Sequence, residues 1–75
     1  MTEKQLYEKA LNYLNEQYAL VRSFMDSGED KVAIGVYNKI AAYIQFMLAI
    51  GLVDYEDWVK MMDNHHLFFD AVFLG

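Results

Sequence analysis

The sequence predicts an all-α fold, a three-helix up-down-up bundle, from three observations. It contains no Pro among its 75 residues, and Pro interrupts helices by removing a hydrogen bond and clashing with the preceding turn. Apolar residues recur at alternating steps of four and three, which is the helical period. Two glycines, Gly28 and Gly51, divide the chain into three segments of similar length, and short connections make successive helices antiparallel. We expect one helical domain over residues 1–75, with helices at about 2–26, 29–50 and 54–73.

The first segment carries a start signal and one apolar face. Thr2 and Gln5 have the capping-box spacing, in which each side chain satisfies a backbone N–H of the first helical turn. Gly28 should end this helix because Gly adopts the left-handed conformation without steric cost. The expected apolar face consists of Tyr7, Leu11, Leu14, Tyr18, Val21 and Met25.

The second segment is apolar nearly all round, which favours a central, buried helix. One narrow stripe of polar or small residues interrupts it. Either this stripe faces water, or its small members let another helix approach closely. We favour water, because a buried Lys or Gln would need compensating partners. The stripe consists of Lys31, Gly35, Asn38, Ala42, Gln45 and Ala49.

The third segment begins with a strong helix start. Gly51 should end the second helix and Asp54 should cap the third, with Val53 and Trp58 at the positions of a hydrophobic staple. The expected apolar stripe is Tyr55, Trp58, Val59, Met62, His66, Phe69 and Phe73, with Met61, His65, Phe68 and Val72 beside it. At Asn64 the helix either continues or gives way to a short fourth C-terminal helix.

The apolar content points to a binding function. A chain this short buries only about 60% of the surface that its unfolded form exposes, yet 56% of its residues are hydrophobic. Apolar surface left exposed usually marks a contact with another molecule. We therefore expect a non-catalytic protein–protein interaction module that forms a homodimer, binds a protein target, or both. The expected contact residues are Trp58, Phe68, Phe69, Val72 and Phe73, with Tyr13 and Tyr37 as further surface aromatics.

The net charge of −5 excludes direct nucleic-acid binding, because the six basic residues are spread singly and phosphate binding needs a basic patch. It suggests an alternative function instead. A small acidic inhibitor or adaptor, imitating nucleic acid, could occupy a basic site on a nucleic-acid-handling protein. The acidic residues for this are Asp54, Glu56 and Asp57, which also suit the positive end of the helix dipole.

The chain offers little material for catalysis. It has no Cys, its serines Ser23 and Ser27 have no paired base, and no Gly-rich phosphate loop is present. We expect no enzyme activity and no cofactor. The lack of Cys and of a signal-peptide pattern also makes a cytoplasmic location the expectation.

A divalent metal site is a second alternative function. On a helix, Asp63, His66 and Asp70 share one face, but structural zinc requires four ligands, mostly Cys or His. We therefore expect no metal, with His66 lining the edge of the core and His65 solvated or at an interface. Since His titrates near neutrality, a pH-dependent association through the pair is an equal possibility.

The apolar run from 40 to 53 raises the question of a membrane. It is interrupted only by Gln45, but it is shorter than the about 20 residues that a membrane-spanning helix needs. A buried core helix explains it better, and we expect no membrane association.

The chain resembles the small, acidic, all-helical proteins encoded by phages and mobile elements. The resemblance rests on size, charge and the helix junction from Gly51 to Trp58. Many proteins of this group inhibit or redirect a host protein, which is what the resemblance implies here. It includes no diagnostic motif, so it assigns no functional residue.

Overall fold

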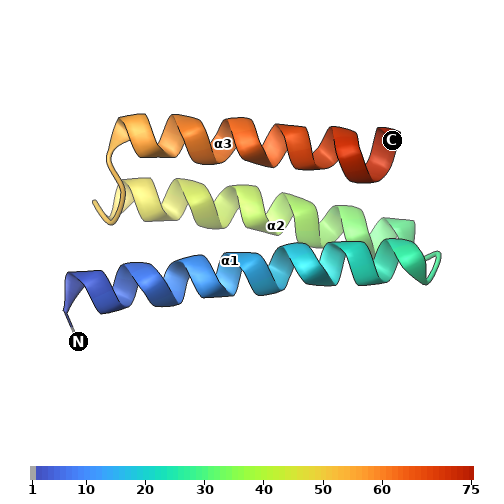
Figure 1. Cartoon of the computed structure of the whole chain (residues 1–75), viewed down its shortest axis with the longest axis horizontal. Helices are drawn as coiled ribbons and strands as arrows, with labels where there is room; N and C mark the ends of the chain where they lie inside the picture. Colours follow the sequence, from blue (N-terminus) through green and yellow to red (C-terminus); the bar gives the residue numbers. More distant parts are fainter. Residues whose placement is uncertain (1) are drawn as a thin grey trace. The chain divides into compact units, whose positions relative to one another are not determined.

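A computed structural model describes residues 2–75. Within these residues the chain forms three α-helices and one π-helical segment, with no strand (Figure 1). The elements are α1 (Glu3–Asp26), α2 (Asp30–Ala49), α3 (Tyr55–Phe69) and η1 (Asp70–Leu74). The predicted all-α class with three helices is confirmed, and each helix starts within about a residue of its expected position.

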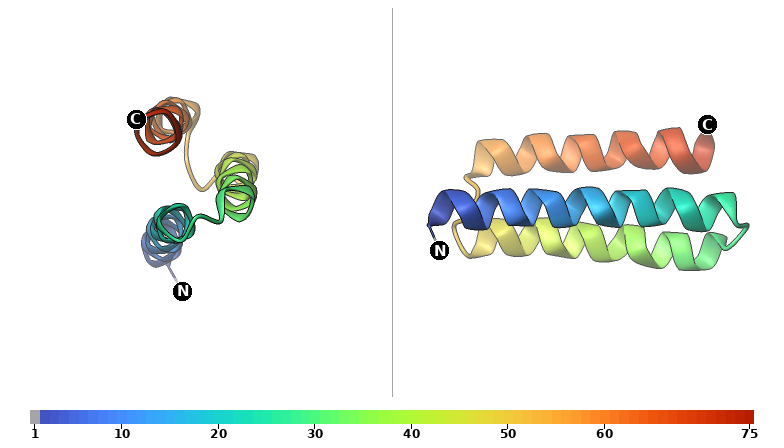
Figure 2. Two further views of the ribbon diagram at one scale, coloured as in Figure 1. Left: turned by 90° about the vertical axis from the view of Figure 1, so that its right-hand side faces the viewer. Right: turned by 60° about the horizontal axis from the view of Figure 1, so that its bottom comes forward.

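The contacts within the chain group into two compact units. The N-terminal unit is Met1–Ile40, and the C-terminal unit is Ala41–Gly75. In the N-terminal unit, α1 and the first half of α2 run in opposite directions, and in the C-terminal unit the second half of α2 and α3 do the same (Figures 1 and 2). The short turns between the helices require this antiparallel order within each unit.

The first helix begins with the capping box that the sequence predicts. Thr2 Oγ1 accepts a hydrogen bond from the backbone N–H of Gln5 at 3.2 Å, and Gln5 Oε1 accepts one from the backbone N–H of Thr2 at 2.9 Å. Two N–H groups that lack a partner inside the helix are thereby satisfied. α1 therefore starts at Glu3, directly after its cap.

Both interhelical turns are Schellman motifs centred on glycine. Gly28 and Gly51 have positive φ values of 77° and 76°, the left-handed region that Gly enters without steric cost. After Gly28, the N–H of Glu29 donates to Phe24 O at 2.8 Å. After Gly51, the N–H of Leu52 donates to Met47 O at 2.9 Å. These bonds satisfy the last carbonyl groups of α1 and α2 and end both helices where the sequence predicts.

The buried residues lie on one face of each helix. In the N-terminal unit, Val21 and Ala33 are fully buried. In the C-terminal unit, Ile44, Met47 and Val53 are buried together with one polar residue, His65. The remaining buried side chains of the N-terminal unit are Ala10, Leu14, Tyr37 and Ile40.

The second helix is not buried all round, contrary to the sequence prediction. It buries only one face. Val32, Ile34 and Phe46 of α2 are exposed, and so is Ile50, the residue directly after the helix. A helix is buried on all sides only when other helices surround it, and the two other helices of this chain are too few for that. All six residues of the polar and small stripe are exposed, so the interpretation that this stripe is not buried within the chain is confirmed: Lys31, Gly35, Asn38, Ala42, Gln45 and Ala49.

The third helix passes through Asn64 without a break. At its end, Asp70 keeps right-handed helical dihedral angles of −59° and −42° and donates its N–H to the carbonyls of His66 and Leu67. The chain then widens into η1, a single π-helical turn. The ring of Phe69, the last residue of α3, stacks on the ring of Phe73 in η1 at 4.9 Å between centroids. Of the two alternatives expected at Asn64, the structure therefore has the continuing helix, which η1 extends directly after Phe69.

Candidate interaction surfaces

The five apolar contact residues expected from the sequence are half-buried: Trp58, Phe68, Phe69, Val72 and Phe73. None of them is among the large apolar side chains that the structure exposes. The indole Nε1 of Trp58 is also buried and makes no hydrogen bond within residues 2–75. This donor therefore faces the protein and does not present itself to a partner. We expected the apolar side chains of the C-terminal segment to be exposed. In the structure this segment continues α3, and part of its apolar surface is buried against the protein.

The large apolar side chains that are exposed lie elsewhere. In the N-terminal unit the exposed set within the described residues is Leu6, Leu20, Val32 and Ile34, and in the C-terminal unit it is Phe46, Ile50, Tyr55, Leu67 and Leu74. Exposed apolar side chains are ordinary when they are scattered, and they suggest binding when they are contiguous. Which of these residues adjoin one another therefore decides which surface is a candidate.

Phe46 and Ile50 adjoin one another at the end of α2. They are one helical turn apart, so they share a face, and they are 57% and 53% exposed. Ala42 and Ala49 are exposed on the same side. We call these four residues the α2 apolar face. No charged residue occurs between positions 40 and 53, so no charge on this stretch of chain interrupts the face.

The exposed apolar residues of α3 do not form a comparable group. Tyr55 packs against Trp58 with 5.6 Å between ring centroids. Leu67 is 64% exposed, but its neighbours one turn before and after on the same face are Asp63 and Asp70. This part of α3 is an ordinary solvated face with a single Leu in it.

Sequence reasoning placed Ala42 and Ala49 in the outward stripe but missed Phe46 and Ile50, because it counted the large apolar residues of this segment as core. A signal was nevertheless present. The polar and small stripe defined the outward side of the helix, and Phe46 follows Ala42 by four residues and precedes Ala49 by three. It therefore shares that outward side of the helix.

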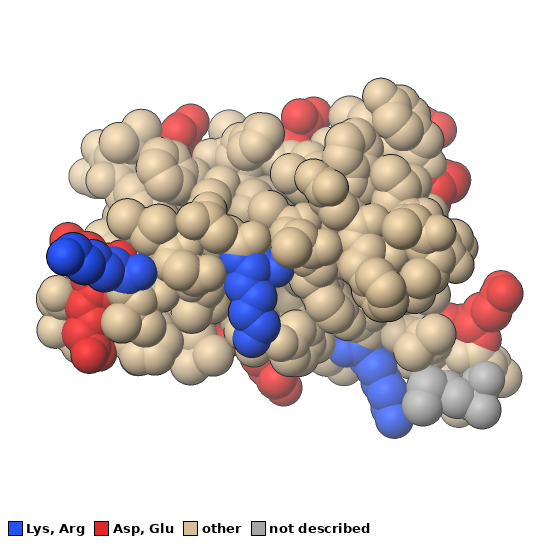
Figure 3. Space-filling view, turned by 180° about the vertical axis from the view of Figure 1, so that it is seen from behind, with Lys and Arg blue, Asp and Glu red and all other residues tan. Residues whose placement is uncertain are grey.

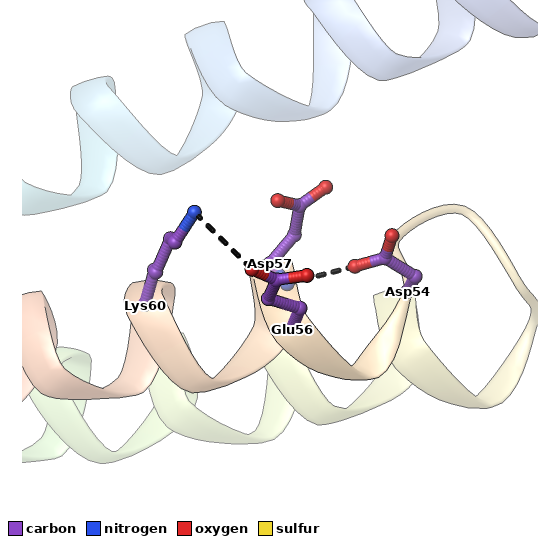
Figure 4. A network of polar contacts seen from close by, with 4 residues as sticks. All are labelled: Asp54, Glu56, Asp57 and Lys60. Atoms are coloured by element: carbon purple, nitrogen blue, oxygen red, sulfur yellow. Dashed lines mark hydrogen bonds and ion pairs between the residues drawn. The ribbon is translucent and has the colours of Figure 1, made fainter.

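The acidic residues expected at the start of α3 are all exposed there (Figure 4). Asp54 caps the helix, since its Oδ1 accepts the backbone N–H of Asp57 at 2.8 Å. Lys60 Nζ lies 4.0 Å from Glu56 Oε1, in a pair whose side chains are 69% and 83% exposed. Such exposed pairs contribute about 0–1 kcal/mol. This acidic group therefore has one structural member, Asp54, one member in a weak exposed ion pair, Glu56, and the exposed Asp57.

Basic residues form no comparable group on the face seen in Figure 3, where the Lys and Arg side chains are separated by other residues. This distribution matches the sequence, in which the six basic residues are spread singly. It gives no support to a phosphate-binding surface.

A group of tyrosines lies in the N-terminal unit. Burial raises the pKa of the Tyr18 hydroxyl to about 12, and the neighbouring Tyr37 adds to this shift. Tyr37, which the sequence analysis placed among the surface aromatics, is buried at 9% exposure. Tyr13 is half-buried, with Lys39 Nζ 6.0 Å from its ring centroid, which is the limit for a cation–π contact. These rings serve packing and leave little surface for a partner.

The two histidines have the reverse of their expected positions. His65 is 1% exposed, and His66 is exposed. Their rings lie side by side at 6.4 Å between centroids. The inward face of α3 is therefore rotated by one residue from the expected stripe, toward Met61, His65 and Phe68. The error arose because both stripes are apolar, and periodicity alone did not rank them.

The metal candidates Asp63, His66 and Asp70 are all exposed on α3. Within residues 2–75, no three His, Asp or Glu side chains gather in a way that could hold a metal ion. A shallow depression on α1 is lined by Gln5, Glu8, Lys9 and Asn12. Its lining residues all come from one helix and are all polar or charged, whereas hydrophobic and aromatic side chains predominate in ligand pockets.

By length and composition alone, α2 is suited to cross a membrane. An 18-residue stretch of α2 has a mean hydropathy of 1.3, and 28% of that stretch is buried. This stretch is longer than the apolar run from 40 to 53, because it begins earlier in α2 and includes Lys39. Length and hydropathy are properties that core helices of soluble proteins share, so they assign no location.

Comparison with known protein families, with curated proteins and with solved structures gives no match. The resemblance to small phage-type proteins therefore stays an expectation.

Proposed function

We propose that the protein is a non-catalytic interaction module that self-associates, binds a protein target, or does both through exposed apolar surface. The observation that supports this proposal is the exposure of large apolar side chains, with Phe46 on α2 adjoining Ile50 directly after the helix. Exposing them costs about 25 cal/mol for each Å² of apolar surface in water. A protein surface that covered them would recover this free energy.

A test of the proposal is light scattering over a series of protein concentrations, combined with a dye that fluoresces on apolar surfaces. We expect a mass above 8.8 kDa at high concentration, or dye binding that a partner suppresses. A monodisperse monomer at every concentration, together with no dye binding, would contradict the proposal.

An acidic inhibitor or adaptor is the second candidate, and the exposed acidic group at the start of α3 favours it. Residues 54–70 carry five acidic side chains and one basic one. Such a surface would attract a basic groove on a nucleic-acid-handling protein over about 8–10 Å at physiological salt.

The second candidate is tested with charge reversal at Glu56 and Asp57. Asp54 is left intact, because replacing this cap would cost about 1 kcal/mol of helix stability and confuse the result. We expect the Glu56→Lys, Asp57→Lys double variant to keep its helical circular dichroism and to lose binding to a basic target. Binding that is insensitive to both salt and charge reversal would rule out this candidate.

A further inference from the structure

We propose that the α2 apolar face is the docking site for a second copy of this chain, with two α2 helices packed antiparallel across a two-fold axis near Phe46. This inference rests on the proposed function and assigns a surface and an occupant to it. The face consists of Ala42, Phe46, Ala49 and Ile50, all exposed.

The charge distribution favours this face for self-association. The chain has a net charge of −5, so two copies repel each other wherever acidic surfaces meet. In the C-terminal unit, every charged residue lies between positions 54 and 70, where the sum is −4. The α2 apolar face has none, so two copies meet through it without opposing like charges.

An antiparallel arrangement also brings opposite charges together at the ends of the contact. With Phe46 on the two-fold axis, each residue lies opposite the one equally far from position 46 in the copy. Lys39, at the earlier end, then approaches the turn between α2 and α3 of the copy, where Asp54 is exposed. A parallel arrangement would place Lys39 opposite Lys39 instead.

The side chains of the face are complementary under the same symmetry. A two-fold contact uses the same patch on both copies, so each residue must fit its symmetry mate. Ala42 lies opposite Ile50 of the copy, a small residue against a large one. The two Phe46 rings meet at the axis, where aromatic pairs contribute beyond the area that they bury.

A lipid surface fits the face less well than a second copy does. Helices that lie on membranes carry many Lys and Arg residues on the side facing the headgroups. α2 has only Lys31 and Lys39, and a chain of charge −5 is repelled by anionic lipid. The side of α2 opposite the face is packed in the core, at Ile44 and Met47.

The size of the face sets the expected strength of the dimer. A stable interface buries about 800 Å² on each partner, and the four side chains of this face supply less than this. We expect a dissociation constant of roughly micromolar order, and association should be measured across that range of concentration.

The test is sedimentation equilibrium of the wild type and of two variants that add the same charge. Phe46→Glu places a carboxylate at the centre of the face. Leu67→Glu is the matched control, because Leu67 is similarly exposed, at 64% against 57%, and lies on α3 beside other acidic residues. Both changes put a good helix former at an exposed helical position, and circular dichroism checks that the fold is kept.

We expect the wild type and Leu67→Glu to dimerise with affinities within about threefold of each other, and Phe46→Glu to dimerise at least about tenfold more weakly. Equal dimerisation of all three proteins would overturn this assignment and leave the proposed function standing. A wild type that stays monomeric at every concentration would overturn both this inference and the self-association part of the proposed function. Monomeric wild type that binds phosphatidylcholine vesicles, with loss of binding in Phe46→Glu, would assign the face to lipid and overturn the second copy.

The register is tested with single cysteines, since the chain has no native Cys. A disulfide needs the two Cα atoms within about 7 Å, which a residue near a two-fold axis satisfies. We expect Phe46→Cys to cross-link at least about tenfold faster than Leu67→Cys under mild oxidation. Equal rates would overturn the axis at Phe46.

Discussion

At the scale of single residues, His65 and His66 show how much a neighbouring position on a helix changes a side chain's role. His65 is 1% exposed and His66 is exposed, although they are adjacent in the sequence. Successive helical residues point about 100° apart, so only one of the pair can lie at the centre of the inward face. The structural role therefore belongs to His65.

Alanine substitution of the two histidines tests this difference. We expect His65→Ala to lower the free energy of unfolding by about 2–4 kcal/mol, because it leaves a cavity in the core. His66→Ala should change it by less than about 0.5 kcal/mol, as is usual for surface positions. Urea denaturation of both variants measures the two values. A larger loss for His66→Ala than for His65→Ala would contradict the assigned orientation of α3.

The raised pKa of Tyr18 predicts that the protein loses stability in alkaline solution. Its hydroxyl has a pKa of about 12 in the folded chain against 10.0 for an unperturbed Tyr. The unfolded state therefore ionises first as the pH rises, which favours unfolding. The contribution of Tyr18 to stability is complete below pH 10 and is lost as the pH rises through about 12.

Urea denaturation at several alkaline pH values checks this prediction, with Tyr18→Phe as the control. Phe cannot ionise, so the variant should lose stability less steeply than the wild type between pH 10 and about 12. Partial exposure of Tyr18 keeps the difference smaller than for a fully buried group. Parallel curves for the two proteins would show that this hydroxyl is not responsible.

At the scale of elements, the two turns and the caps are what the sequence predicts best. They depend on a few local residues, such as Thr2, Gly28, Gly51 and Asp54, whose chemistry acts within one turn of chain. The orientation of α3 depends instead on which of two apolar stripes meets other helices. That choice is made by tertiary packing, so periodicity left it open. The π-helical end at η1 has no local sequence signal that we can identify.

The same substitution at two glycines separates backbone strain from packing. An added Cβ would meet nothing within 4 Å at either Gly51 or Gly35. Gly51 has a φ of 76°, which other residues adopt only at a cost, so Gly51→Ala should destabilise the protein by about 1 kcal/mol. Gly35 lies inside α2 with ordinary helical φ, so Gly35→Ala should stabilise it by about 0.5–1 kcal/mol. Thermal unfolding measures both, and shifts of the same sign would contradict this account of the turn.

At the scale of the whole molecule, the chain has more apolar side chains than its three helices bury. Its hydrophobic fraction of 56% predicted this excess, and the exposed side chains of Leu6, Phe46 and Leu74 are part of it. Composition could predict the excess because it needs no knowledge of packing. It could not predict the location, and the residues named from the sequence, such as Phe68 and Phe73, are half-buried.

Sedimentation equilibrium of the unmodified protein, from low to high micromolar concentration, tests the central claim most directly. If exposed apolar surface drives self-association, the average mass will rise with concentration from 8.8 kDa toward twice that value. A mass that stays at 8.8 kDa over the whole range would contradict the claim.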